Sequence, residues 1–113
     1  MIVNIASICG MEGCTGAPHY SAAKAGILGF TRAVAKEVIV QGVRVNAIAP
    51  GYIDTPMVGQ LPTTVRQATV LQTPIGRLGL PKEIGALALF LATDEAAFFV
   101  GATLSPNGGF VTV

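Results

Sequence analysis

Residues 43–51 read VRVNAIAPG, an apolar, β-branched run that ends in a Pro-Gly pair. An uninterrupted run of this kind predicts a strand over residues 43–48 that is buried on both faces of a parallel sheet. The segment MIVNIA, residues 1–6, has the same character and predicts a second buried strand. Helical sequence separates the two strands, which is typical of parallel strands joined by a right-handed crossover. The chain is therefore expected to have an α/β fold with a parallel sheet.

The crossover helix is expected to begin at Pro18, because proline is well suited to the first helical turn. No further proline occurs before about Val40, and Gly42 then ends the helix near its C-cap. Residues 7–17 precede the helix and contain three glycines with polar neighbours. They predict a loop.

The second half of the chain is predicted to alternate in the same way. Residues 54–72 are polar and broken by two prolines, which favours short helices on a flap. A helix is expected from Pro81, with Glu83 in its first turn, where the helix dipole favours an acid. Residues 102–104 predict a third short strand. With no repeat and no linker, residues 1–113 are interpreted as one domain.

The composition is apolar for a chain of this size. Of the 113 residues, 51% are hydrophobic and 12% are charged, whereas charged residues usually make up about a quarter of a protein. This balance indicates apolar faces that meet partners. The net charge of +1 without a basic cluster gives no electrostatic support for nucleic-acid binding.

Neither a membrane span nor an export signal is expected. No apolar run reaches the ~18 residues that a membrane span needs. Residues 1–7 lack the basic start of a signal peptide, so a cytoplasmic protein is expected.

Three residues are positioned for joint chemistry. Tyr20 and Lys24 are four apart on the same predicted helix, which places them on one face, one turn apart. Ser7 follows the first strand, and ligands of parallel sheets bind at the carboxyl ends of the strands. The sequence therefore predicts that Ser7, Tyr20 and Lys24 converge at this edge.

These side chains suit the reduction of a carbonyl group. A tyrosine phenol has a pKa of about 10, which is too high for efficient proton exchange near neutral pH. The ammonium group of Lys24 favours the phenolate and is expected to lower that pKa. The Ser7 hydroxyl can bond the substrate oxygen, and Tyr20 can protonate that oxygen as hydride arrives at the carbon.

The segments NIAS at 4–7, YSAAKAG at 20–26 and VNAIAPGYIDT at 45–55 resemble the short-chain dehydrogenase/reductase family. Residues 101–109 resemble the C-terminal segment of that family, so the likeness covers essentially the whole chain. The resemblance implies the C-terminal part of a Rossmann-like, doubly wound parallel sheet with about three strands plus helices. The N-terminal nucleotide-binding half would be missing.

The resemblance also implies roles for the three residues and a cofactor. Ser7 would position the substrate, Tyr20 would be the acid/base, and Lys24 would lower the tyrosine pKa. The implied cofactor is NAD or NADP, with Tyr20 and Lys24 also in contact with it, Lys24 through the nicotinamide ribose.

A second group of cofactor contacts is implied where the second strand ends. Pro50 and Gly51 would place the backbone of Ile53 against the nicotinamide carboxamide. Thr55 would lie near that carboxamide or near the pyrophosphate.

The glycine-rich fingerprint with which the family begins is not found. Gly10, Gly13 and Gly16 follow a strand, but their spacing is not that of a dinucleotide-binding turn. Without the preceding strands, strand 1–6 would present an unpaired edge. The chain is therefore expected to be held by its missing half, to aggregate or to form a homo-oligomer, a dimer or tetramer, through the helix 18–41 and the C-terminal segment.

The remaining polar residues predict no other chemistry. His19 is the only histidine, but a Ser7–His19–Asp54 hydrolase lacks the Gly-x-Ser-x-Gly elbow, so His19 is interpreted as a loop or pocket residue. Cys9 and Cys14 are predicted to be free thiols that fill the loop. The acidic residues show no paired ligand pattern, so no metal site is predicted.

Three functional hypotheses follow. Residues 51–55, 77–84 and 104–109 resemble acyl-carrier-protein or acetoacetyl-CoA reductases. Reduction of a 3-oxoacyl thioester, as in fatty acid biosynthesis, is therefore the first hypothesis. A sugar, polyol or other secondary-alcohol dehydrogenase is the alternative substrate class. The third hypothesis is a non-catalytic folding or assembly module, because half of the cofactor site is absent.

Overall fold

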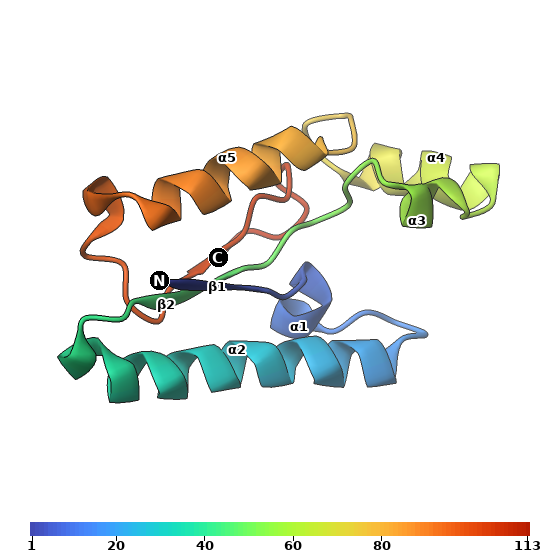
Figure 1. Ribbon diagram of the computed structural model, residues 1–113. Coiled ribbons are helices and arrows are strands. Elements are labelled where there is room, and N and C mark those ends of the chain that lie inside the picture. The colour runs from blue at the N-terminus through green and yellow to red at the C-terminus, as the bar shows by residue number, and fades with distance from the viewer.

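The computed structural model describes residues 1–113 as three layers, with helices on both faces of a small sheet (Figure 1). The strands β1 (Ile2–Ile5), β2 (Val45–Ile48) and β3 (Thr103–Leu104) are parallel and adjacent in the order β1-β2-β3. In register, Ile2 pairs with Val45, and Ala47 pairs with Thr103. The predicted parallel α/β fold with three strands is confirmed.

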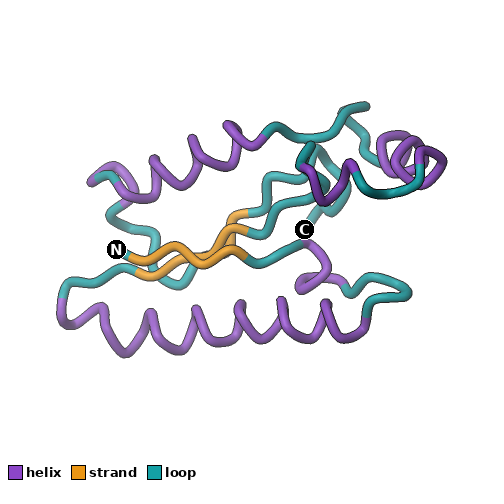
Figure 2. The backbone as a smooth tube through the Cα atoms, turned by 45° about the vertical axis from the view of Figure 1, so that its right-hand side comes forward, coloured by secondary structure: helices purple, strands orange, loops and turns teal.

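The long helix α2 (Pro18–Val38) covers one face of the sheet, and α5 (Pro81–Ala92) covers the other (Figures 1 and 2). A single 3-10 turn, η1 (Ile39–Gln41), extends α2, and Gly42 ends it with a φ of 79°. Both helices therefore occupy the predicted positions. No helix in the structure combines the length and apolar character needed to cross a membrane.

The flap consists of two short helices, α3 (Pro56–Gly59) and α4 (Thr63–Gln72), as expected. It lies beyond the carboxyl ends of the strands, near the start of α5 (Figure 1). The 3-10 turn η2 (Asp94–Ala96) follows α5 and leads back toward β3.

Glu83 caps the start of α5 from inside its first turn. Its carboxylate accepts hydrogen bonds from the guanidinium of Arg77, at 2.8 and 3.0 Å, and from the Leu80 backbone N–H at 2.8 Å. The Arg77 hydrogen bond, followed by the Leu80 N–H, lowers the pKa of Glu83 to about 2. The carboxylate therefore stays ionised and keeps the segment before α5 attached to its first turn.

Two local predictions were wrong. The segment 7–17, expected to be a loop, contains the short helix α1 (Ile8–Glu12). Ser7 caps its start and Gly13, with a φ of 78°, closes it. Five residues are too few to show a helical period in the sequence, which is why composition alone indicated a loop.

The strand β1 is not buried on both faces, contrary to the expectation for residues 1–6. Ile2 and Ile5 remain 47% and 46% exposed, whereas all four residues of β2 are buried. The reason is position, because β1 lies at the edge of the sheet and pairs only with β2. The predicted unpaired edge is confirmed.

The core is divided by the sheet into two small clusters. Ala6, Leu28, Ala47 and Ala49 pack on the α2 side, where alanines allow close approach of helix and sheet. On the α5 side the buried residues are Ile48, Leu91 and Ala96.

Asn46 is the fully buried polar residue of the central strand. Its Nδ2 donates to the Phe99 carbonyl at 2.9 Å, and its Oδ1 accepts from the Ala102 N–H at 2.9 Å. The side chain thus satisfies two backbone groups in the segment that leads into β3. It fixes β3 beside β2, where the ladder is only two residue pairs long.

We expect Asn46→Ala to destabilise the fold by about 2–4 kcal/mol, because it removes two hydrogen bonds and leaves two backbone groups unsatisfied. The matched control is Asn4→Ala on the edge strand. Asn4 makes one bond, to Thr31, whose hydroxyl also bonds the Ile27 carbonyl. Its loss should cost about 1 kcal/mol or less. Urea unfolding followed by circular dichroism, at one protein concentration, measures the stability loss of both variants. Equal unfolding midpoints for the two variants would contradict the role of Asn46 in fixing β3.

Candidate functional site

Ser7 lies directly after β1 and serves as the N-cap of α1. Its side chain is almost completely buried, and its Oγ accepts a hydrogen bond from the Cys9 N–H at 3.1 Å. A serine hydroxyl that accepts one bond still has its own proton to donate. The Ser7 hydroxyl is therefore held in place and keeps a free donor.

The backbone on both sides of Ser7 is tied to the end of β2. The Ala6 N–H donates to the Ile48 carbonyl at 2.7 Å, and the Ile8 N–H donates to the Pro50 carbonyl at 3.1 Å. Parallel pairing thus continues past the ends of β1 and β2. It places Ser7 and the Pro50-Gly51 segment side by side at one edge of the sheet.

Tyr20 lies in the first turn of α2, and Lys24 lies one turn later on the same face. The Lys24 Nζ is 5.6 Å from the centroid of the Tyr20 ring and donates to the Ile5 carbonyl at 3.2 Å. Ile5 ends β1, two residues before Ser7. Lys24 therefore connects the Tyr20 ring with the end of the strand that carries Ser7.

The helix α1 rests on α2 at the level of Lys24. A Cβ atom added to Gly10 would lie 2.6 Å from the Lys24 carbonyl carbon and 2.7 Å from the Ala25 nitrogen. Such distances leave no room for a side chain, so only glycine permits this contact. Gly10 was not predicted as a site residue, because residues 7–17 were predicted to be a loop, where glycine is common.

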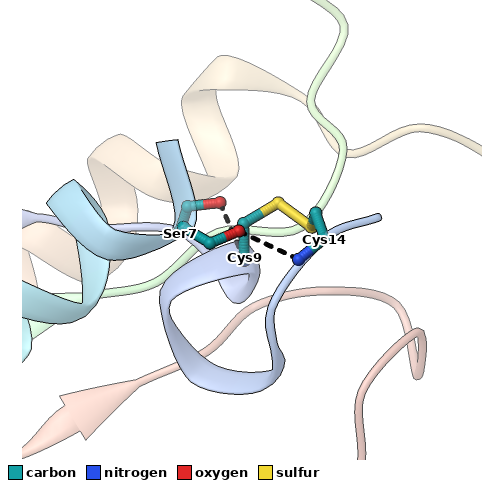
Figure 3. The surroundings of a disulfide bond; sticks show 4 residues. Ser7, Cys9 and Cys14 are labelled. Atoms are coloured by element: carbon teal, nitrogen blue, oxygen red, sulfur yellow. Dashed lines mark hydrogen bonds between the residues drawn. A yellow bond between two sulfur atoms is a disulfide. The ribbon is translucent and has the colours of Figure 1, made fainter. Parts of the chain in front are cut away.

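Cys9 and Cys14 form a disulfide, with their Cα atoms 5.0 Å apart (Figure 3). The prediction of free thiols was therefore wrong. The pairing depends on the short helix α1, which brings Cys9 close to the residue after its C-cap, Gly13, and which the sequence pattern did not predict.

The Pro50-Gly51 segment approaches the C-terminal turn very closely. The Gly51 N–H donates to the Pro106 carbonyl at 3.0 Å, and a Cβ atom at Gly51 would lie 2.8 Å from the Cβ of Asn107. Glycine is thus required for close packing here.

Ile53 forms an isolated parallel bridge with Gly79. The bonds of this bridge run from the Asp54 N–H to the Gly79 carbonyl, at 2.8 Å, and from the Gly79 N–H to the Tyr52 carbonyl, at 2.9 Å. In an extended chain, the N–H and C=O of the central residue point to the opposite side. The polar backbone groups of Ile53 are therefore directed away from Gly79 and take no part in the bridge.

Thr55 caps α3, since its Oγ accepts from the Val58 N–H at 3.3 Å. His19 and Asp54 are both exposed, and neither forms a hydrogen bond with Ser7. The structure thus brings the Ser7 loop next to Lys24 and next to Pro50. It gives no support to a serine hydrolase arrangement.

Several known proteins that are similar to this chain are reductases by name. Residues 1–111 match a family model described as Enoyl-(Acyl carrier protein) reductase. The chain is 54% identical over 109 residues to an acetoacetyl-CoA reductase of Shinella zoogloeoides, covering 96% of this chain and 45% of that protein. It is 47% identical to the 3-oxoacyl-(acyl-carrier-protein) reductase FabG of Vibrio cholerae, covering 99% and 46% of the two chains.

A third relative acts on a different type of substrate by name. It is the cis-4-hydroxycyclohexanecarboxylate dehydrogenase of Sinomonas cyclohexanicum, 48% identical, with 99% of this chain and 45% of that protein covered. The chain thus spans about half the length of the curated relatives it matches.

We expect Gly10→Ala to destabilise the protein by about 1–3 kcal/mol, because the new methyl group meets helix backbone that cannot move aside. Gly26→Ala is the matched control. Nothing lies within 4 Å of its added Cβ, so the higher helix propensity of alanine should stabilise it by about 0.5–1 kcal/mol. Urea unfolding is expected to show a lower free energy of unfolding for Gly10→Ala and a higher one for Gly26→Ala than for the parent protein. A Gly10→Ala protein as stable as the parent would show that α1 does not rest on α2.

Proposed function

The chain belongs to the short-chain dehydrogenase/reductase family, and we propose that it supplies the proton-transfer part of an NAD(P)-dependent oxidoreductase. The observation that carries this proposal is the position of Lys24. Its ammonium group lies beside the Tyr20 ring and is bonded to the carbonyl that ends the Ser7 strand. The family membership, the shared helix face of Tyr20 and Lys24, and the bond of Lys24 to the end of β1 therefore all favour Tyr20 as the acid/base group.

The residues present fit the nicotinamide end of NAD or NADP. Lys24 uses one of its three N–H donors on Ile5, which leaves others for a ribose hydroxyl. The backbone N–H and C=O of Ile53 are free to pair with a carboxamide. Pro50 and Gly51 position that backbone, and the Thr55 hydroxyl keeps its proton to donate. When bound, the cofactor would supply or accept the hydride.

Each of the three catalytic candidates has one task. Ser7 donates its hydroxyl proton as a hydrogen bond to the substrate carbonyl oxygen and holds it in place. Tyr20 gives its phenolic proton to that oxygen as the carbonyl carbon is reduced. The cation of Lys24 stabilises the phenolate that remains. In the direction of oxidation, the phenolate of Tyr20 takes the proton from the alcohol.

A 3-oxoacyl thioester is the substrate class that we propose, in line with the names of the relatives that reduce acetoacetyl-CoA and 3-oxoacyl groups. An open groove of about 520 Å³ along α4 of the flap supports it, since a long substrate needs an open, partly apolar surface. The groove is lined by Asp54, Arg66, Gln67, Val70, Leu71 and Leu78. A role in fatty acid biosynthesis in the cytoplasm belongs to the same proposal.

The alternative is a dehydrogenase for another secondary alcohol. The relative that oxidises a hydroxycyclohexanecarboxylate favours it. Comparing kcat/KM for acetoacetyl-CoA and for a cyclic secondary alcohol separates the two substrate classes.

We expect Tyr20→Phe to lower kcat for acetoacetyl-CoA reduction by about 10²–10⁴-fold, the usual contribution of a general acid, with little change in KM. Tyr52→Phe is the matched control, because the chain has only two tyrosines and Tyr52 packs against Phe110. Steady-state kinetics with NADPH and NADH measures both, in the 113-residue chain or in a longer protein that contains it. A Tyr20→Phe protein that turns over normally would refute the assignment. A 113-residue chain that binds neither cofactor would favour the non-catalytic folding module.

Association with a second copy is also part of the proposal. Phe30 on α2 is 61% exposed, and it lies beside the free edge of β1 in a shallow depression that also includes Asn4 and Ile5. An apolar patch next to an unpaired strand is a typical site of self-association.

We expect sedimentation velocity to show dimers or larger species of the 113-residue chain, and Phe30→Asp to shift them toward monomer, because a buried carboxylate opposes association. Leu71→Asp is the control, since Leu71 is 86% exposed on the distant flap. A monomer that unfolds cooperatively at all concentrations tested would contradict the proposed association.

A further inference from the structure

The Cys9–Cys14 bridge lies within the candidate active site. Cys9 is in the first turn of α1, and Cys14 follows the glycine that closes this helix. Figure 3 shows the bridge beside Ser7. Both cysteine residues are only partly buried, so an external thiol has access to this part of the surface.

The backbone N–H of each cysteine is also bonded to a serine side chain at the candidate active site. The Cys9 N–H donates to the Ser7 Oγ at 3.1 Å. The Cys14 N–H donates to the Ser21 Oγ at 2.9 Å, and Ser21 is the residue after Tyr20. The bridge therefore connects the Ser7 hydroxyl with the start of the helix that carries Tyr20.

The bridge closes the part of this segment that lies beyond the contacts of Ile8 with Pro50 and of Gly10 with α2. The helix α1 has only five residues, and a helix of that length is not stable by itself. Gly13 and Gly16, with φ of 78° and 82°, give the chain after it a wide choice of conformations. Opening the S–S bond would release the end of α1 and, with it, the Cys14 contact to Ser21.

The bridge is poorly suited to support the whole fold. It joins residues only five apart, and the stabilisation from a cross-link is smallest for the shortest loops. Its main effect is local and falls on the loop between Ser7 and Tyr20. In reducing compartments, the disulfides that form are usually transient and serve catalysis or redox sensing.

We propose that Cys9–Cys14 is a thiol–disulfide exchange site, reduced by dithiols, whose oxidised form keeps Ser7 and Tyr20 ordered. A thiolate of the dithiol attacks one sulfur, which breaks the Cys9–Cys14 bond and forms a mixed disulfide. The second thiolate of the dithiol displaces that cysteine, and the dithiol leaves as its own disulfide. Two electrons pass to the protein, and the two cysteine thiolates take up the two protons that the dithiol has lost.

The exchange is tested on the purified 113-residue chain, equilibrated with mixtures of reduced and oxidised dithiothreitol. The samples are quenched with acid, alkylated and counted for free thiols by mass spectrometry. Both cysteines should be oxidised and reduced together and reversibly, while the protein keeps its native far-UV circular dichroism. Two thiols that stay reduced in oxidised dithiothreitol, or a bridge that opens only in denaturant, would overturn the proposal.

The effect on the site is read from hydrogen exchange. Reduction should speed amide exchange in peptides covering residues 7–21 by about tenfold or more, and leave peptides covering β2 unchanged. The double variant Cys9→Ser/Cys14→Ser should match the reduced protein and no longer respond to dithiothreitol. Equal exchange of residues 7–21 in both redox states would refute the coupling.

The consequence for turnover rests on the proposed function. Reduction should lower kcat in any active protein that contains this chain, and the double-serine variant should be slow in both redox states. If the dehydrogenase proposal fails, no turnover is seen, yet the exchange difference at residues 7–21 remains. The two proposals can therefore fail separately.

Discussion

Pairing of β2 on both of its sides is the constraint on which the rest of the structure depends. Its four residues are buried, and its ladder with β1 continues through the bonds of Ala6 to Ile48 and of Ile8 to Pro50. On the other side, the Gly51 N–H reaches the Pro106 carbonyl. Because all three strands are parallel, the segments that follow them emerge at one edge of the sheet. The Ser7 loop and residues 50–55 are neighbours for this reason.

The helix α2 adds the acid/base group to that edge. Its position relative to the sheet depends on small side chains, since Ala6, Ala47 and Ala49 pack with Leu28 on this face. The absent side chain of Gly10 then allows α1 to contact α2 at Lys24. The serine and the tyrosine are thus carried by different elements, a short loop helix and a long rigid helix. The order of the loop and of the first turn of α2 can change while the rest of that helix stays in place, and the disulfide lies at the junction of the loop and the helix.

The low content of charged residues is explained by the apolar side chains that the small sheet leaves on the surface. With only three strands, the sheet leaves β1 with one partner, and Ile2 and Ile5 remain about half exposed. Phe30 adds an aromatic side chain to the same region. Residues that were expected to be core therefore form an apolar surface. The chain spans about half the length of its curated relatives.

The sequence alone determined the features that depend on local pattern. The apolar run at 43–48, the proline-initiated helix 18–41 and the spacing of Tyr20 and Lys24 are properties of consecutive residues, and the structure agrees with each of them. The features that the sequence pattern did not predict were decided mainly by the tertiary structure. The edge position of β1, the approach of Gly10 to Lys24 and the ordering of α1 over residues predicted to be a loop all depend on the assembled sheet and the helix packed on it. The Cys9–Cys14 bridge is local in sequence, but it depends on the fold of α1 and its closing glycine, which bring the two sulfur atoms within bonding distance.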